Sequence, residues 1–171
     1  MPSLPDDRFP LPENFGPGSV WADRTGHRTL MGRNQRGVEI PIGYGEGEIN
    51  PGELLKIALI GCAGMSSDTN LSRRLGEDYD ARLWAHGTSD EAANRYFTIA
   101  EEAQLPLEGL TEKEIATVVK VFSRAVEVGC TVERSVVAGV EVTHRILGAE
   151  PAAEPTAAAP SADIAQEDPR S

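Results

Sequence analysis

The chain has 171 residues, of which 27 are acidic and 16 are Lys or Arg, so its formal net charge is −11. Nucleic acids and anionic membrane surfaces attract basic patches, and this charge balance argues against both as partners. Two cysteines are too few for a disulfide scaffold, and the three histidines are too widely spaced for a zinc signature.

The two ends of the chain differ in composition from its middle. Residues 1–18 are rich in Pro, Asp and Gly, lack the layout of a signal peptide, and are expected to form an extended arm. Residues 149–171 are mostly Ala, Pro and acidic residues, which offer too little apolar surface to offset the entropy of ordering. We expect this acidic tail to be disordered and residues 19–148 to form one domain. No apolar run reaches the roughly 20 residues that cross a bilayer, so we expect a cytoplasmic protein.

The domain is predicted to begin with strands. Residues 19–42 contain short apolar runs separated by the turn sequences "TGHR" and "RNQRG". The glycine-rich segment 43–49 follows, but it lacks the spacing of a phosphate-binding loop. We therefore expect no nucleotide cofactor at this loop.

A long helix is predicted next. Asn50 is a suitable N-cap, Pro51 suits the first helical position, and Glu53 completes a capping-box pattern. The helix is expected to continue to Gly76, which is a plausible terminator. Its first half, up to Met65, is apolar nearly all round, so we expect this half to be buried on all sides.

The second half of the domain is predicted to contain three strands and a second helix. Thr111 and Glu114 form a capping box, and Gly129 stands where that helix ends. The strands are expected within residues 78–88, 95–107 and 139–147, and the helix within 111–129. Together these elements predict an α+β fold in which two main helices pack on mostly antiparallel sheets.

The two cysteines allow two interpretations. Cys62 lies inside the first helix and Cys130 follows the second, and free cysteines are commonly inert packing residues. The alternative is a redox pair, which requires Cα atoms roughly 4.4–6.8 Å apart. A reactive Cys62 would need a nearby cation, because apolar burial raises the pKa of a thiol and the middle of a helix gains little from its dipole. The residues alone leave both interpretations open.

Two segments together resemble a known family. The segments "NPGELLKIALIGCAGM" (50–65) and "CTVERSVVAGVEV" (130–142) are similar to the signature of the OsmC/Ohr family, named for osmotically inducible protein C and organic hydroperoxide resistance proteins. The likeness spans about residues 20–147. It implies an OsmC-like α+β fold and an interlocked homodimer with active sites at the subunit interface.

The resemblance also implies an activity. Cys62 matches the peroxidatic cysteine and Cys130 the resolving cysteine of a thiol peroxidase that acts in oxidative stress defence. The expected substrates are organic hydroperoxides, with hydrogen peroxide left open. Cys62 would form a sulfenic acid, Cys130 would condense with it to a disulfide, and an external dithiol, such as a lipoylated protein, would reduce the disulfide. No bound cofactor or metal is expected.

Two further family residues have matches here. Arg24 in "DRTGHR" matches the arginine that activates the thiolate, and Arg28 competes for that role. In the hydroperoxide-resistance branch a glutamate directly after Asn-Pro pairs with this arginine, but here Gly52 holds that place and Glu53 follows it. On a straight helix Glu53 and Cys62 differ by about 180° in direction and about 13 Å along the axis. Glu53 is therefore expected to cap its own helix or to orient the arginine at the dimer interface.

Other functions remain open at this point. Gly52 favours the broader OsmC-like branch, some members of which are expected to bind a small apolar ligand or to sense thiols with little turnover. A structural disulfide or two inert cysteines is the third possibility. His27 and His144 are predicted to be surface or packing residues.

Overall fold

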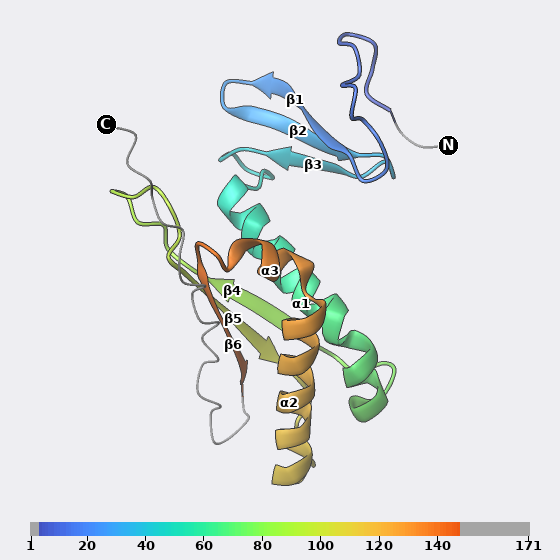
Figure 1. The fold of residues 1–171 in the computed structure, drawn as a ribbon, viewed down its shortest axis with the longest axis vertical. Helices are drawn as coiled ribbons and strands as arrows, with labels where there is room; N and C mark the ends of the chain where they lie inside the picture. Colours follow the sequence, from blue (N-terminus) through green and yellow to red (C-terminus); the bar gives the residue numbers. More distant parts are fainter. Residues whose placement is uncertain (1–3, 148–171) are drawn as a thin grey trace, which may run out of the picture. The chain divides into compact units, whose positions relative to one another are not determined.

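The computed structural model of the chain describes residues 4–147 (Figure 1). The tail at 149–171, predicted to be disordered, lies outside the described residues. The elements in chain order are β1 (Val20–Gly26), β2 (Thr29–Asn34), β3 (Glu39–Ile42), α1 (Pro51–Leu75), β4 (Arg82–His86), β5 (Thr98–Gln104), α2 (Glu112–Gly129), α3 (Thr131–Val136) and β6 (Glu141–Leu147). This is an α+β fold with two sheets and three helices, and it confirms the predicted fold class.

The chain divides into two compact units. One unit extends to Leu55 and contains β1, β2 and β3, and the other begins at Lys56 and contains the remaining strands together with α2 and α3. Helix α1 begins in the first unit and continues into the second.

The first unit is built on an antiparallel sheet of order β1-β2-β3. Alternation along the strands gives this sheet two chemically different faces. Ala22 pairs with Gly32, which pairs with Ile40, and these positions share the face on which Arg24 pairs with Leu30. This apolar face is open, because Val20 is 74% exposed and Leu30 and Ile40 are each 37% exposed.

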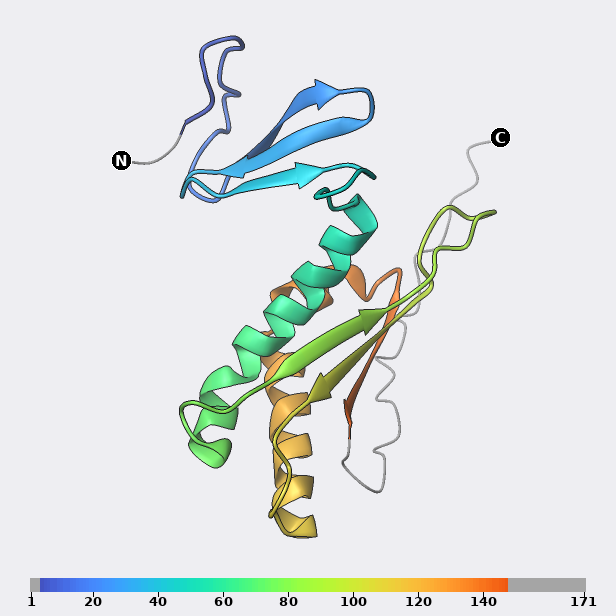
Figure 2. The same ribbon diagram turned by 180° about the vertical axis from the view of Figure 1, so that it is seen from behind.

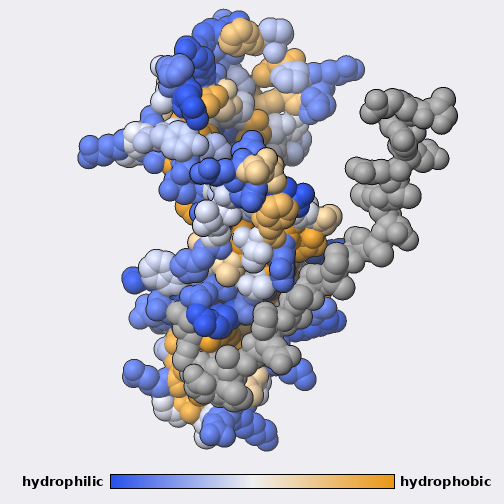
Figure 3. Space-filling view, turned by 90° about the vertical axis from the view of Figure 1, so that its left-hand side faces the viewer, coloured by the Kyte–Doolittle hydropathy of each residue, from blue (hydrophilic) through white to orange (hydrophobic). Residues whose placement is uncertain are grey.

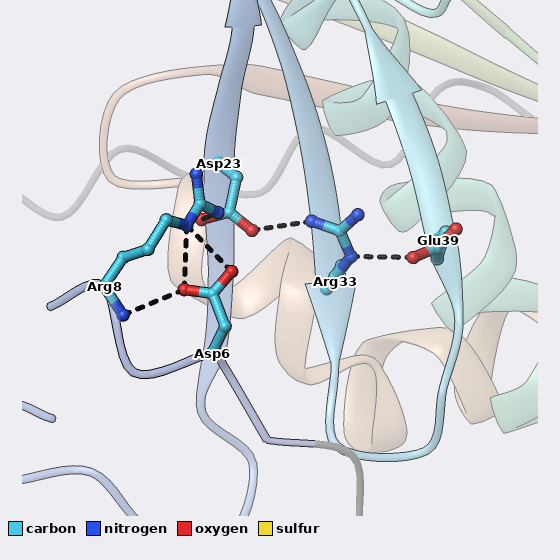
Figure 4. A network of polar contacts seen from close by, with 5 residues as sticks. All are labelled: Asp6, Arg8, Asp23, Arg33 and Glu39. Carbon is cyan, nitrogen blue, oxygen red and sulfur yellow. Dashed lines mark hydrogen bonds and ion pairs between the residues drawn. The ribbon is translucent and has the colours of Figure 1, made fainter.

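The opposite face of the same sheet carries a chain of ion pairs (Figure 4). Arg33 of β2 contacts Asp23 of β1 at 2.6 Å and Glu39 of β3 at 2.7 Å. Arg8 joins Asp23 at 3.3 Å and Asp6 at 2.8 Å. The network therefore ties the N-terminal arm to the sheet, although exposed ion pairs of this kind stabilise a fold only modestly.

The second unit has two layers, a three-stranded sheet and a layer of helices. Its strand order is β4-β5-β6, and the lower part of Figures 1 and 2 shows α1 and α2 on one face of this sheet. Strands β4 and β5 are antiparallel, whereas β5 and β6 are parallel. A parallel pair needs a long crossover connection, which α2 and α3 supply.

The predicted helix boundaries agree with the structure. Asn50 and Glu53 exchange hydrogen bonds at the start of α1, with the Asn50 N–H donating to the Glu53 carboxylate at 2.9 Å and the Glu53 N–H donating to the Asn50 side chain at 3.0 Å. Gly76 ends α1 at a φ of 100°, which favours glycine. Thr111 and Glu114 form the expected capping box of α2.

The prediction that α1 is buried on all sides is wrong for this chain. The sheet and α2 cover only one side of the helix, where Leu59, Ala63 and Leu71 are buried. On the other side Ile57 is 52% exposed and Met65 is 83% exposed. A helix that is apolar all round is expected to be buried on several sides. One sheet and one neighbouring helix, however, can cover only one side of α1.

The surface carries both hydrophilic and apolar side chains. Figure 3 shows mostly hydrophilic residues on the face it views, with apolar residues between them. Within residues 4–147, none of the helices combines the length and the apolar character that crossing a membrane requires.

Candidate active site

The structure brings the two predicted cysteines together in the second unit. Cys62 is half-buried on α1 and packs against the core cluster that contains Cys130, which is 0% exposed. Both are free thiols. The fold therefore packs the two segments that carry the cysteines into one core.

Cys62 is positioned by the helical periodicity of α1. Leu59, Ala63 and Ser67 follow one another at spacings of four residues and face the core. Cys62 lies beside this buried stripe and is therefore half-buried. The neighbouring exposed positions on the helix, Ala58 and Met65, are apolar.

Cys130 is positioned by the break between two helices. Its backbone is extended, with φ −77° and ψ 96°, so it ends α2 and begins α3. The backbone N–H of Glu133 donates a hydrogen bond to the Cys130 sulfur at 3.4 Å. The cysteine is therefore held at both its backbone and its sulfur.

A glycine allows the end of α2 to approach α1 closely. A Cβ atom on Gly129 would lie 3.3 Å from the Cβ and Oγ atoms of Ser66, one turn after Cys62. This is tighter than ordinary van der Waals contact, so a larger residue would push the two segments apart. Gly129 thus keeps the backbone of Cys130 near the helix that carries Cys62.

The surroundings of Cys62 favour its thiolate. Burial raises the pKa of the Cys62 thiol, but hydrogen bonds from the Val132 backbone and from the side chains of Cys130, Thr131 and Ser66 lower it by more, so the pKa lies below its ordinary value. The Thr131 hydroxyl oxygen lies 3.9 Å from the Cys62 sulfur. Neutral donors therefore stabilise the thiolate within this unit.

The surroundings of Cys130 favour its neutral thiol. Burial raises the pKa of Cys130, and donating a hydrogen bond to Cys62 and the negative charges of Cys62 and Glu133 raise it further. The N–H of Glu133 opposes this effect only in part. The two environments therefore move the two pKa values apart, downward for Cys62 and upward for Cys130.

Arg24 and Glu53 belong to the other unit. Arg24 is an exposed residue of β1, and within residues 4–55 its side chain has neither a hydrogen-bond nor an ion-pair partner. Arg28, its competitor, lies over the ring of Tyr44 at 5.5 Å and adopts a left-handed φ of 58°. Glu53 accepts a hydrogen bond from Asn50, as its capping interpretation predicts. The pairing of an arginine or of Glu53 with the thiols stays a prediction.

The sequence interpretation missed a buried charged cluster beside Cys130. His144 of β6 lies with its Nε2 atom 3.3 Å from a carboxylate oxygen of Glu101 and 3.7 Å from one of Glu133. Strand alternation could have revealed two of these residues. Glu101 stands between the buried Ile99 and Ala103, and His144 between the buried Val142 and Ile146. The expectation that His144 is only a packing or surface residue therefore overlooks two charged neighbours.

Comparisons with solved structures define the class of fold. An OsmC-like protein of unknown function from Vibrio cholerae is 16% identical with a TM-score of 0.59, and the alignment covers 75% of this chain and 97% of that one. An OsmC-like protein from Mycoplasma pneumoniae is 9% identical with a TM-score of 0.60, over 75% and 94% of the two chains. The organic hydroperoxide resistance protein OhrB of Bacillus subtilis is 16% identical with a TM-score of 0.53, over 75% and 96%. The fold is therefore that of the OsmC/Ohr family.

Sequence comparison adds closer relatives. Uncharacterised proteins of Mycobacterium tuberculosis and Mycobacterium bovis are 44% identical over 130 residues, which is 75% of this chain and 95% of theirs. No family model matches the chain. The chain belongs to one family with these mycobacterial proteins, within the OsmC/Ohr fold.

Proposed function

We propose that the protein is a cysteine-based thiol peroxidase that reduces organic hydroperoxides in oxidative stress defence. The observation that carries this proposal is the arrangement of the two cysteines, in which a half-buried Cys62 of lowered pKa packs against the core cluster that holds a buried Cys130 of raised pKa. A thiolate is the nucleophile in peroxide reduction, and a second thiol within contact distance allows the product to be resolved.

The proposed cycle has three steps. The Cys62 thiolate attacks the terminal peroxide oxygen, the O–O bond breaks, and the alkoxide takes a proton and leaves as an alcohol. The Cys130 sulfur then attacks the sulfur of the Cys62 sulfenic acid, an S–S bond forms, and the hydroxyl group leaves with the Cys130 proton as water. An external dithiol reduces the disulfide by exchange and leaves as its own disulfide. Keeping both thiols reduced between turnovers suits a cytoplasmic setting.

The preference for an organic hydroperoxide rests on the exposed side of α1. Ala58 and Met65 flank Cys62 at spacings of four and three residues, so they are its neighbours on the helix surface. Both side chains are apolar and exposed. They offer contacts to the hydrocarbon part of a substrate that hydrogen peroxide lacks.

The proposal includes a homodimer in which a second copy supplies the cation. The open face of the β1–β3 sheet combines apolar residues with Arg24, and a hollow of about 410 Å³ on this sheet is lined by residues that include Val20, Ala22 and Ile40. An open apolar face on a three-stranded sheet favours association. We propose that Arg24 of a partner stabilises the Cys62 thiolate and that Glu53 orients this arginine.

Mass spectrometry of the intact protein tests the proposed chemistry. One equivalent of cumene hydroperoxide should remove two hydrogens and produce a cross-linked peptide that contains Cys62 and Cys130. Cys62→Ser should abolish the reaction, whereas Cys130→Ser should retain a sulfenic acid that dimedone traps. Two unmodified thiols after treatment of the wild-type protein would exclude a peroxidase.

A second function keeps the same site without turnover. Gly52 occupies the position at which the hydroperoxide-resistance branch has the glutamate that pairs with the activating arginine. The exposed apolar side of α1 also suits a small ligand. Steady-state consumption of hydroperoxide with excess dithiol separates the two functions. Turnover near the protein-free rate, despite disulfide formation, would favour ligand binding or thiol sensing.

A further inference from the structure

The buried cluster behind Cys130 is built from three different elements. Glu101 of β5 and His144 of β6 are direct partners in the parallel register, and Glu133 comes from α3. The side chains of His144, Glu133 and Glu101 are only 12%, 11% and 3% exposed. From α2, the ring of Phe122 packs edge-on against His144 at 6.4 Å between ring centroids. Two carboxylates and one imidazole thus lie together, almost completely buried from solvent.

The cluster depends on charge more than on well-formed hydrogen bonds. Among the described residues, both carboxylate oxygens of Glu101, Oε2 of Glu133 and Nε2 of His144 lack a hydrogen bond of ordinary geometry. Buried carboxylates without such bonds are costly unless a cation is close. The imidazolium of His144 is the cation that lies within ion-pair distance of both.

Two groups of the cluster, His144 and Glu133, have pKa values above their ordinary values. Burial lowers the pKa of His144, but the close approach and charge of Glu101 and the charge of Glu133 raise it by more. Burial raises the pKa of Glu133, as do Glu101 and Glu127, while His144 lowers it. The His144–Glu133 ion pair is therefore lost as the pH rises through the raised pKa of His144, and also as the pH falls through the raised pKa of Glu133.

Glu133 connects this cluster to the resolving cysteine. Its backbone N–H donates to the Cys130 sulfur at 3.4 Å, while its carboxylate lies 3.7 Å from His144. The residue therefore joins the Cys130 turn to the sheet through one short side chain. The titratable groups around this turn are Cys62 from α1, Glu101 from β5, Glu127 from α2 and Glu133 and His144 themselves.

We propose that His144 is a positioning residue for resolution, which pairs with Glu133 and thereby holds the turn of Cys130 against Cys62. This inference rests on the proposed peroxidase function. In the resolution step the Cys130 sulfur attacks the Cys62 sulfur, the S–O bond breaks, and water leaves with the Cys130 proton. His144 exchanges no proton in this step and acts only through Glu133. Loss of its charge leaves two buried carboxylates facing each other, which loosens the turn.

Single-turnover kinetics test this role. Disulfide formation from the Cys62 sulfenic acid should slow as the pH rises through the titration of His144, which NMR measures in the wild-type protein. His144→Gln should remove this pH step and slow resolution about tenfold at neutral pH, because contacting residues couple at this scale. Adding Glu133→Gln should restore much of the rate, since the second buried carboxylate is then gone.

A matched pair on the other side of the sheet provides the control. His86 lies 3.7 Å from Glu102, but the His86 side chain is 58% exposed. His86→Gln should leave resolution and its pH profile unchanged. A wild-type rate and pH profile in His144→Gln would overturn the proposal, as would a double variant no faster than His144→Gln.

Two measurements separate this inference from the proposed function. Diamide, a thiol oxidant, adds to Cys62 across its N=N bond, after which Cys130 displaces the hydrazine and forms the same disulfide. If hydroperoxide leaves both thiols intact, the peroxidase proposal fails, but diamide kinetics still test His144. If His144→Gln does not fold, hydrogen exchange of the wild-type protein tests whether His144 holds the Cys130 turn. Amides 131–136 should exchange faster once His144 loses its proton, beyond the intrinsic effect of pH, and unchanged protection would overturn the proposal.

Discussion

The segment of α1 around Cys62 and the junction of α2 and α3 around Cys130 hold the same side chain in opposite environments. Cys62 lies on a continuous helix with one accessible side and several neutral hydrogen-bond donors. Cys130 lies at an extended residue between two helices, fully buried and close to the charge of Glu133. Burial and the type of neighbour, rather than the thiol itself, therefore decide which cysteine has the lowered pKa and which has the raised pKa.

The largest expected effect is on activity, and it comes from replacing either cysteine, because the two variants should stop the proposed reaction at different steps. Cys62→Ser should reduce hydroperoxide consumption to the protein-free rate, because the only accessible thiolate is lost. Cys130→Ser should still consume one equivalent and then stop at the sulfenic acid. Stopped-flow assays with and without a dithiol measure both results, and equal activities in the two variants would contradict the assigned roles.

Alkylation should show the difference without any peroxide. Below the ordinary pKa of cysteine, Cys62 should react with iodoacetamide more than about a hundredfold faster than Cys130, because it has the lower pKa and the greater access. Peptide mapping across a pH series gives both rates. Comparable rates at neutral pH would remove the distinction between a nucleophile and a resolving thiol.

A methyl group at Gly129 should separate the two segments. The added Cβ would lie 3.3 Å from Ser66, so Gly129→Ala should lower the free energy of unfolding by about 1 kcal/mol and slow disulfide formation. Gly64→Ala on α1 is the control, because its Cβ would meet Leu83 at an ordinary 3.6 Å. That control should gain about 0.5–1 kcal/mol from helix propensity. Denaturation curves measure both, and equal gains would show that the contact is not tight.

The smallest expected effect concerns a single hydroxyl group. Thr131→Val removes one donor to Cys62, so the pKa of Cys62 should rise and its alkylation profile should move up by about a few tenths of a pH unit. Thr117→Val removes a hydroxyl that donates to the Lys113 carbonyl on α2 and should leave the profile unchanged. A profile that does not move in Thr131→Val would leave the backbone of Val132 and the Cys130 thiol as the main donors.

Much of the fold was predictable because its signals are local. Caps, turn residues and periodicity depend on residues a few positions apart, and they predicted both long helices and every strand of residues 4–147. Helix α3 was not predicted, since six residues after a helix end carry little periodicity. The parallel pairing of β5 with β6 depends on how the crossover packs, which strand patterns do not reveal.

The candidate site was likewise predictable only where its signals are local. The resemblance identified Cys62 and Cys130, and the structure packs Cys62 against the core cluster that contains Cys130. The importance of Glu101, Glu133 and His144 did not emerge, because each looks ordinary in its own segment and the cluster exists only where three elements meet.

The sequence by itself determined the two long helices, the strands, the capping interactions and the positions of the two cysteines, because these follow from short-range geometry and a recognisable pair of segments. Only the tertiary structure decided that one side of α1 stays open, that Gly129 brings Cys130 toward Cys62, and that a buried histidine stands between two carboxylates. Burial and charge interactions depend on which distant residues share a space, and that is settled only when the chain packs.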